Sequence, residues 1–317
     1  MSPRACKRAV HSARWFQPER LPLGAALFAS GCFLSFAPGD EGAQPTSWPE
    51  IASLSLGIRH ACAIGPEDNV ICWGANDYGQ SAPPDIPMKL VAAGQVHTCG
   101  ITLEDGRAVC WGSDRTGRAD APANEQFVSL SAGGGHTCGI TRDRAVLCWG
   151  SWHYVPPLPL PFEPPSQGEF RQVTQGDAHG CALSVAGKVT CWGDYYAFLG
   201  APESKIFERI DSGFSHVCGL TSAGEVECWG EPLNEPNIPA GSYVDVSAGN
   251  ATCALRDDGS FVCSNVVDPP PGPMTEVVAG RHHVCGVHEG GGVQCWKQAG
   301  SDMEQELTPP PQLHRRR

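Results

Sequence analysis

Fourteen of the sixteen cysteines fall into seven regularly spaced pairs, and this spacing constrains the fold more than any other feature. The two members of a pair lie ten residues apart, or eleven in one case. Successive first members lie 37, 39, 43, 37, 35 and 32 residues apart. The pairs are Cys62 with Cys72, Cys99 with Cys110, Cys138 with Cys148, Cys181 with Cys191, Cys218 with Cys228, Cys253 with Cys263, and Cys285 with Cys295. A motif at this period predicts a repeat protein whose units bury their apolar faces against one another.

Each repeat has the pattern of a β-hairpin. In the second repeat, two apolar runs flank a turn signal at Glu104-Asp105-Gly106. If Cys99 faces Cys110 across this hairpin, residue 101 pairs with 108 and residue 97 with 112. Side-chain alternation then puts His97 and both cysteines on one face and Trp111 on the other, so that both faces are apolar. Small sheets covered on both sides predict an all-β protein, a seven-bladed propeller with one disulfide in each blade.

The paired cysteines have three interpretations. Directly opposed residues of antiparallel strands lie within disulfide range, and closing an eleven-residue loop would stabilise the fold by roughly 2–3 kcal/mol. A metal site is the second, because His97, Cys99 and Cys110 share a face, although the tight Cys-x-x-Cys spacing of zinc sites is absent. Buried reduced thiols are the third. We expect disulfides in all seven pairs, because the chain also carries an export signal.

The order Gly-x-x-His, Asp-Gly, Trp-Gly resembles the regulator of chromosome condensation repeat. The segment Asn76-Asp77-Tyr78-Gly79-Gln80 after the first Trp-Gly fits as well, and the resemblance extends over residues 51–296. It implies a seven-bladed propeller that binds proteins, since the family includes a nuclear exchange factor for a small GTPase, a plant light sensor and secreted inhibitors of β-lactamase. The paired cysteines depart from the better-known members and suggest a secreted branch of bacterial type.

Residues 1–32 have the composition of a targeting segment. Basic residues precede an apolar run over residues 21–30, and this run is short for a membrane-spanning helix. Ala29-Ser30-Gly31-Cys32 resembles a lipoprotein cleavage site, at which Cys32 would receive the lipid. The alternatives are a secretory peptide cleaved near Ala37 and a start codon downstream of Met1. We therefore expect a signal peptide over 1–32, a linker over 33–49, the propeller over 50–298 and a disordered tail over 299–317, in a monomer outside the cytoplasm that is secreted or lipid-anchored.

Charge argues against a nucleic-acid partner. The whole chain carries a net charge of −12, and removing the five bases and one acid of residues 1–32 leaves 17 bases against 33 acids, or −16. Such a surface repels phosphate. A membrane contact is expected only through a lipid on Cys32.

The repeated histidines and tryptophans are expected to be structural. The histidines are His60, His97, His136, His179, His216 and His283. A metal ring or a proton relay is the alternative, but in repeats one to five each histidine faces the glycine of Cys-Trp-Gly. We expect each imidazole to fill the space beside that glycine and to bond nearby backbone. The tryptophans recur once per repeat except at Ser264, which predicts that the sixth blade is the least well packed.

Two segments interrupt the repeat and are the candidate partner-binding loops. Residues 151–169 form a proline-rich insertion, and residues 194–198 form a shorter aromatic one. The candidate contact residues are Trp152, His153, Tyr154, Phe162, Tyr195, Tyr196 and Phe198. Aromatic residues are favoured at binding hot spots, whereas the alternative is that both loops cover blade edges.

The sequence carries no catalytic motif and implies no cofactor. Phosphate-binding loops, nucleophile elbows, His-Glu-x-x-His and calcium loops are absent, and every cysteine beyond the targeting segment has an expected mate. We therefore expect a non-enzymatic protein-binding scaffold. The alternatives are a channel-sited enzyme or carbohydrate-binding propeller, and an exchange factor for a small GTPase.

Overall fold

The computed structural model describes residues 51, 53–151, 163–193, 202–230, 238–266, 269–289, 291–298 and 308–313. The chain divides into two compact units, Met1–Phe33 and Leu34–Arg317, and all described residues belong to the second. Within them, 21 strands form seven three-stranded antiparallel sheets, and the one helix is a single 3-10 turn, η4 (Pro311–Leu313). This described part holds no helix long and apolar enough to cross a membrane. The predicted all-β, seven-bladed architecture is confirmed.

Each blade is built from three consecutive strands, ordered from the channel outward. Blade 1 contains β1 (Ser53–Leu56), β2 (His60–Ile64) and β3 (Val70–Gly74), and blade 2 contains β4 (Met88–Ala93), β5 (His97–Thr102) and β6 (Ala108–Gly112). Blade 3 contains β7 (Phe127–Ala132), β8 (His136–Thr141) and β9 (Val146–Gly150), and blade 4 contains β10 (Phe170–Gln175), β11 (His179–Ser184) and β12 (Val189–Gly193). Blade 5 contains β13 (Phe207–Ser212), β14 (His216–Thr221) and β15 (Val226–Gly230). Blade 6 contains β16 (Asp245–Ala248), β17 (Thr252–Leu255) and β18 (Phe261–Cys263), and blade 7 contains β19 (Met274–Ala279), β20 (His283–His288) and β21 (Val293–Lys297).

The strand register is the one that the cysteine spacing predicts. In blade 2, Cys99 lies opposite Cys110, and residues 97 and 101 pair with 112 and 108. The two cysteines of every other repeat are likewise direct partners across the middle and outer strands. The predicted hairpin geometry therefore holds in all seven blades, including the one whose cysteines are eleven residues apart.

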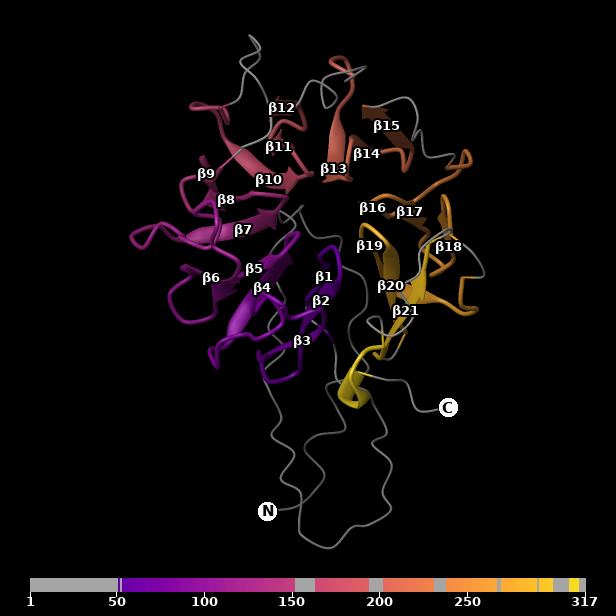
Figure 1. Ribbon diagram of the computed structural model, residues 1–317. Coiled ribbons are helices and arrows are strands. Elements are labelled where there is room, and N and C mark those ends of the chain that lie inside the picture. The colour runs from indigo at the N-terminus through magenta and orange to yellow at the C-terminus, as the bar shows by residue number, and fades with distance from the viewer. Residues whose placement is uncertain are drawn as a thin grey trace, which may run out of the picture. The chain divides into compact units, whose positions relative to one another are not determined.

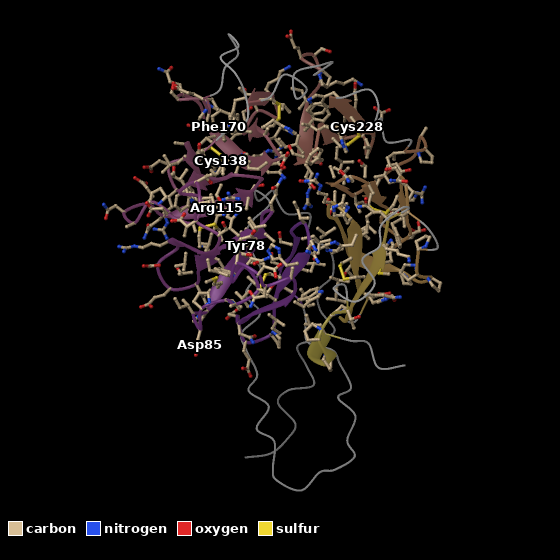
Figure 2. The ribbon with its side chains drawn as sticks, in the orientation of Figure 1. Tyr78, Asp85, Arg115, Cys138, Phe170 and Cys228 are labelled. Atoms are coloured by element: carbon tan, nitrogen blue, oxygen red, sulfur yellow. A yellow bond between two sulfur atoms is a disulfide. The ribbon has the colours of Figure 1, made fainter. Side chains whose placement is uncertain are left out.

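All seven predicted disulfides are present, with Cα atoms 4.0–4.1 Å apart. Several are visible as yellow bonds in Figure 2. The bonds join Cys62 with Cys72, Cys99 with Cys110, Cys138 with Cys148, Cys181 with Cys191, Cys218 with Cys228, Cys253 with Cys263, and Cys285 with Cys295. Each bond therefore links the middle strand of a blade to its outer strand, and none links two blades.

The seven innermost strands lie side by side around a central axis (Figure 1). Each contacts the innermost strand of the next blade, and β19 of blade 7 contacts β1 of blade 1, which closes the ring. The sequence allows residues 51–56 to complete the last blade, but β1 pairs with β2 in the first blade instead. In the described residues the ring is therefore closed by packing between blades, because blade 7 takes all three of its strands from its own repeat.

Hydrogen bonds between innermost strands link five neighbouring pairs of blades. In each, a side-chain oxygen near the end of one strand accepts from a backbone N–H of the next strand. The pairs, acceptor first, are Ser55 and Ala93, Ser131 and Gln175, Thr174 and Ser212, Asp211 and Ala248, and Ser247 and Ala279, at 2.8–3.1 Å. Blades 2 and 7 carry Ala92 and Val278 at the equivalent position and offer no acceptor there.

The hydrophobic core is divided among the interfaces between blades. The disulfide face of blade 1, with Cys62 and Ile64, packs against Trp111 on the opposite face of blade 2. The same arrangement recurs around the ring, as in blade 4, whose Cys181 and Leu183 meet Trp229. Blade 6 has Ser264 in place of the tryptophan, and there the interface is filled by Tyr243, Val246 and neighbouring residues. The sequence thus encodes one kind of interface six times and a variant of it at blade 6, because each repeat supplies both complementary faces.

The C-terminal segment contributes to ring closure. Leu313 is 1% exposed and lies in the core between blades 7 and 1, together with Trp73 and Val287. The prediction of a disordered tail over 299–317 is therefore wrong at residues 308–313. The physical reason is that Leu313 buries its side chain against the apolar interface between blades 7 and 1. Ile238 packs against the interface between blades 5 and 6 in the same way.

Candidate functional site

The predicted partner-binding residues cannot be placed. Trp152, His153, Tyr154, Phe162, Tyr195, Tyr196 and Phe198 lie outside the described residues, as does Cys32. The adjoining strands β9 and β12 end at Gly150 and Gly193. Both of those glycines pair with the repeated histidines, so both loops leave from the histidine-bearing end of their blades.

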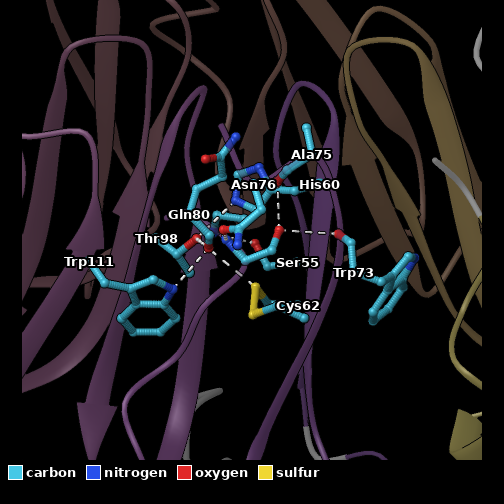
Figure 3. The surroundings of a disulfide bond; sticks show 12 residues. Ser55, His60, Cys62, Trp73, Ala75, Asn76, Gln80, Thr98 and Trp111 are labelled. Carbon is cyan, nitrogen blue, oxygen red and sulfur yellow. Dashed lines mark hydrogen bonds between the residues drawn. A yellow bond between two sulfur atoms is a disulfide. The ribbon is translucent and has the colours of Figure 1, made fainter. Parts of the chain in front are cut away.

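Four of the six repeated histidines bond a side chain of the next blade, which corrects the expectation that their partners are backbone groups alone. His60 Nε2 and Thr98 Oγ1 are 2.8 Å apart, and Thr98 donates its hydroxyl hydrogen to the Gln80 carbonyl at 3.0 Å. His60 is therefore the donor to Thr98. The Trp111 indole donates to the same carbonyl at 2.9 Å (Figure 3). This network joins blade 1, the loop that leaves it and blade 2.

The network recurs one blade further along. His97 bonds Thr137 at 2.7 Å, and the Arg118 carbonyl accepts from Thr137 at 3.4 Å and from the Trp149 indole at 3.0 Å. The loop segments that supply the carbonyls both begin with an Asx residue, Asn76 or Asp114, which accepts from a backbone N–H five residues on. The Asx residue thus holds the loop in the shape that presents its carbonyl.

Other blades vary this arrangement in ways that the sequence makes visible. His216 bonds Thr252, whereas His136 bonds Gln175 because Gly180 occupies the threonine position. His179 Nε2 and both nitrogens of His283 have no partner among the described residues. The residues that would supply a hydroxyl to these two histidines are Val217 and Ala61.

Burial lowers the pKa of all six repeated histidines. It lowers the pKa of His60, His179 and His216 to about 4, and that of His97, His136 and His283 to about 3. They are neutral at physiological pH, and the described residues contain no group of three or more His, Cys, Asp and Glu side chains that could hold a metal ion. Their chemistry is that of neutral donors and acceptors inside the blade interfaces.

Two glycines in each of the first five repeats make room for this arrangement. Gly74, which faces His60, has a φ of 93°, and a Cβ there would lie 2.4 Å from the Arg59 carbonyl oxygen and 2.8 Å from His60 Cα. Gly74 therefore avoids a clash with the backbone of Arg59 and His60, and does not make room for the imidazole as the sequence suggested. The imidazole instead lies against Gly57, where a Cβ would be 2.3 Å from His60 Cε1.

Glycines of this second kind form a ring at one end of the channel. They are Gly57, Gly94, Gly133, Gly176, Gly213, Gly249 and Gly280. For six of them a Cβ would lie 2.1–2.7 Å from the carbonyl oxygen of the next glycine in the ring. The missing side chains allow the neighbouring backbones to approach closely, and all seven glycines are buried.

Two adjoining cavities lie at this mouth. One, of about 100 Å³, is lined by all seven ring glycines, and the other, of about 460 Å³, extends over blade 3. Both are lined by Gln95, Gly134, Asp177 and Arg281. The Gln95 amide donates to Asp177 across Gly134, where a Cβ would lie 2.7 Å from the Asp177 carboxylate. Blades 2, 3 and 4 are bridged above the channel by this contact.

Cationic groups gather on the blade 7 side of the mouth. The Arg281 guanidinium lies over the Phe214 ring, 4.1 Å from its centroid. The pKa of His282 is lowered by burial and, to a smaller extent, by the positive charges of Arg281 and Arg59. These three basic side chains therefore lie near one another. A basic group at this edge contrasts with the net charge of −12.

The innermost strands of blades 5 to 7 carry a second charged group. Asp211, Asp245 and Glu276 lie on consecutive innermost strands, and Arg209 pairs with Asp245 at 3.0 Å. Burial raises the pKa of all three carboxyls, that of Glu276 to about 7, although Arg209 opposes the shift. The Asp211 carboxylate accepts hydrogen bonds from Thr174 of blade 4 and from Ser247 and Ala248 of blade 6. Asp211 itself belongs to blade 5, so these bonds hold blades 4, 5 and 6 together.

Comparison with known proteins supports the repeat assignment. The family model of the regulator of chromosome condensation (RCC1) repeat matches residues 51–80, 88–118 and 127–151, which are blades 1 to 3 with the first residues of the loops that follow them. These are the blades in which the two complete histidine–threonine–carbonyl–tryptophan networks occur.

Solved structures with the same fold include ectodomains. The entire ectodomain of the Physcomitrella patens receptor kinase CR4 is 26% identical, with a TM-score of 0.68 over 79% of this chain and 74% of that one. The CRINKLY WD40 ectodomain of the Arabidopsis thaliana receptor kinase ACR4 is 23% identical, with a TM-score of 0.67 over 83% and 99%. Human WBSCR16 is 14% identical, with a TM-score of 0.62 over 83% and 94%. Together with the seven disulfide-linked sheets, these likenesses show that the chain is a seven-bladed propeller whose first three blades match the regulator of chromosome condensation repeat.

Proposed function

We propose that this protein is a non-enzymatic scaffold that binds a protein partner outside the cytoplasm. The observation that carries the proposal is the disulfide in every blade, linking strands that are already in register. Disulfides persist in oxidising compartments and are rare in the cytosol, where thiols are kept reduced. The likeness to receptor ectodomains supports the same location.

The distribution of polar groups supports a binding role over catalysis. The six histidines are buried, and their lowered pKa values leave them neutral. Five of them line neither mouth cavity, and His136, which lines the larger one, is hydrogen-bonded to Gln175. The channel-wall carboxylate Asp211 is engaged by three hydrogen bonds from neighbouring blades. These groups are used to join blades, so what remains for function is the surface formed by the loops.

The test is affinity capture from the native extract with the disulfide-intact protein, followed by identification of the retained protein. Replacing Trp152, Tyr154 and Phe162 together by alanine should abolish capture if residues 151–169 contact the partner. The control replaces Val128 and Val185, which are 43% and 46% exposed, by alanine. Capture by the triple variant would refute the loop assignment. Turnover in a broad hydrolase screen, lost in a variant of the channel mouth, would refute the non-enzymatic assignment.

A further inference from the structure

The mouth of the channel has the features of a binding site. Its two cavities adjoin, and the larger, of about 460 Å³, falls in the volume range of ligand sites, about 300–1,000 Å³. Its walls include Gly134 and Gly135, which bring backbone to the wall between the polar side chains. We propose that this mouth binds an acidic segment of a protein partner, whose carboxylate pairs with Arg281. The inference rests on the proposed function and names where and how the partner binds.

Arg281 is pre-organised to bind a carboxylate. Its guanidinium is stacked on Phe214 at 4.1 Å, so little side-chain freedom remains to be lost on binding. It lines both cavities, and the nearby Arg59, which acts on His282 as Arg281 does, adds to the local positive potential. A guanidinium pairs with a carboxylate through two parallel hydrogen bonds, which fixes the orientation of the ligand.

Asp177 selects a peptide over a simple anion. Its carboxylate is bonded by the Gln95 amide and lines the same two cavities as Arg281. Phosphate or sulfate near Arg281 would meet this negative charge, which weakens binding of a free anion. A peptide instead offers backbone N–H groups to Asp177 and a carboxylate to Arg281. The site thus matches a chain that carries both a donor and an acid.

The net charge of −12 adds selectivity. An acidic partner is repelled by the net negative charge and attracted at the edge of the mouth where Arg59 and Arg281 lie together. Association with an acidic segment would therefore be directed to the mouth, and its affinity would fall as salt screens Arg281.

The experiment uses a phage-displayed library of random heptapeptides against the disulfide-intact protein. Selected sequences should be enriched in Asp and Glu, and Arg281→Gln should lower their retention at least tenfold. Arg256→Gln is the matched control, because Arg256 is likewise stacked on an aromatic ring, that of Tyr243 at 5.1 Å, in the turn between β17 and β18. A selected peptide resynthesised with Asn and Gln in place of its acids should bind at least tenfold more weakly.

Each other outcome overturns the inference. It fails if no peptide is selected, if the selected peptides are not acidic, or if Arg281→Gln retains them as well as Arg256→Gln does. Displacement of the peptide by submillimolar inorganic phosphate would reassign the mouth as a free-anion site. Native-extract capture separates the two proposals: a partner still held by Arg281→Gln refutes this site and leaves the proposed function standing, whereas absence of any partner refutes the proposed function.

Discussion

His97 of blade 2 and Thr137 of blade 3 are joined by a 2.7 Å hydrogen bond between neighbouring blades. Thr137 follows the equivalent histidine of its own blade, His136. Each of the three repeats that has this threonine receives such a bond from the histidine of the preceding blade. The interface between blades 4 and 5 lacks it, because Val217 stands in the threonine position and leaves His179 Nε2 unpartnered.

Exchanging threonine and valine at these two interfaces should have opposite effects. Thr137→Val leaves a buried imidazole donor unsatisfied and should lower the free energy of unfolding by about 1–3 kcal/mol. Val217→Thr supplies the missing hydroxyl and should raise it by about 0.5–1.5 kcal/mol. Urea unfolding with the disulfides intact measures both. If both exchanges change the free energy of unfolding in the same direction, the hydrogen bond does not govern the stability of these sites.

Acid should destabilise the propeller from about pH 6.5 downward. Burial lowers the pKa of the six histidines from 6.5 to between about 3 and 4. As pH falls, the histidines of the unfolded chain therefore take up protons before those of the folded chain. Their full contribution to the free energy of unfolding is present above pH 6.5, and it is lost as pH falls from 6.5 toward the folded pKa values. Each histidine contributes a slope of up to about 1.4 kcal/mol per pH unit. His283→Gln should make the measured slope between pH 6 and 4.5 shallower, and an unchanged slope would contradict the burial of His283.

Glu276 should have the reverse pH dependence. Its folded pKa is raised from 4.5 to about 7 by burial, with Arg209 and Asp245 acting in opposite senses. The stability cost is absent below pH 4.5, grows as pH rises from 4.5 to about 7, and is complete above 7, where the folded chain holds a buried charge. Glu276→Gln should therefore stabilise the protein at pH 8, by up to about 3 kcal/mol before solvent screening is allowed for, and change little at pH 4. Stabilisation that is equal at both values would rule out titration as its cause.

Leu313 should matter for ring closure although it lies outside the seven repeats. Leu313→Ala empties part of the core between blades 7 and 1 and should cost about 2–4 kcal/mol in thermal or urea unfolding. Val128→Ala, at a side chain that is 43% exposed, is the control and should change stability by less than about 0.5 kcal/mol. If the two variants unfold alike, the last and first blades are held together without the C-terminal segment.

The sequence predicts those features that are contained within one repeat. The cysteine spacing predicts the register of the hairpins, and even the exceptional pairing of His283 with Lys297 follows from it. Contacts between repeats were not predictable in the same way. The threonine that receives each histidine bond lies on the neighbouring blade, and only docked blades show that the two side chains meet.

Features at the channel mouth were missed for the same reason. Gln95 and Asp177 are 82 residues apart and occupy variable positions after the ring glycine, so neither stands out in one repeat. The signal that was available is the glycine itself, which recurs in all seven repeats before the histidine position and marks the tightest approach of the strands to the axis. Leu313 was missed because a proline-rich polar segment reads as disordered when the interface it covers is unknown.

The most direct test is disulfide mapping by mass spectrometry of the unreduced mature protein, purified from its native source with free thiols blocked. Seven linked peptide pairs are predicted, each joining the two cysteines of one repeat and none joining different repeats. Blocked thiols at these fourteen positions would contradict both the covalent design of the blades and the proposed location outside the cytoplasm.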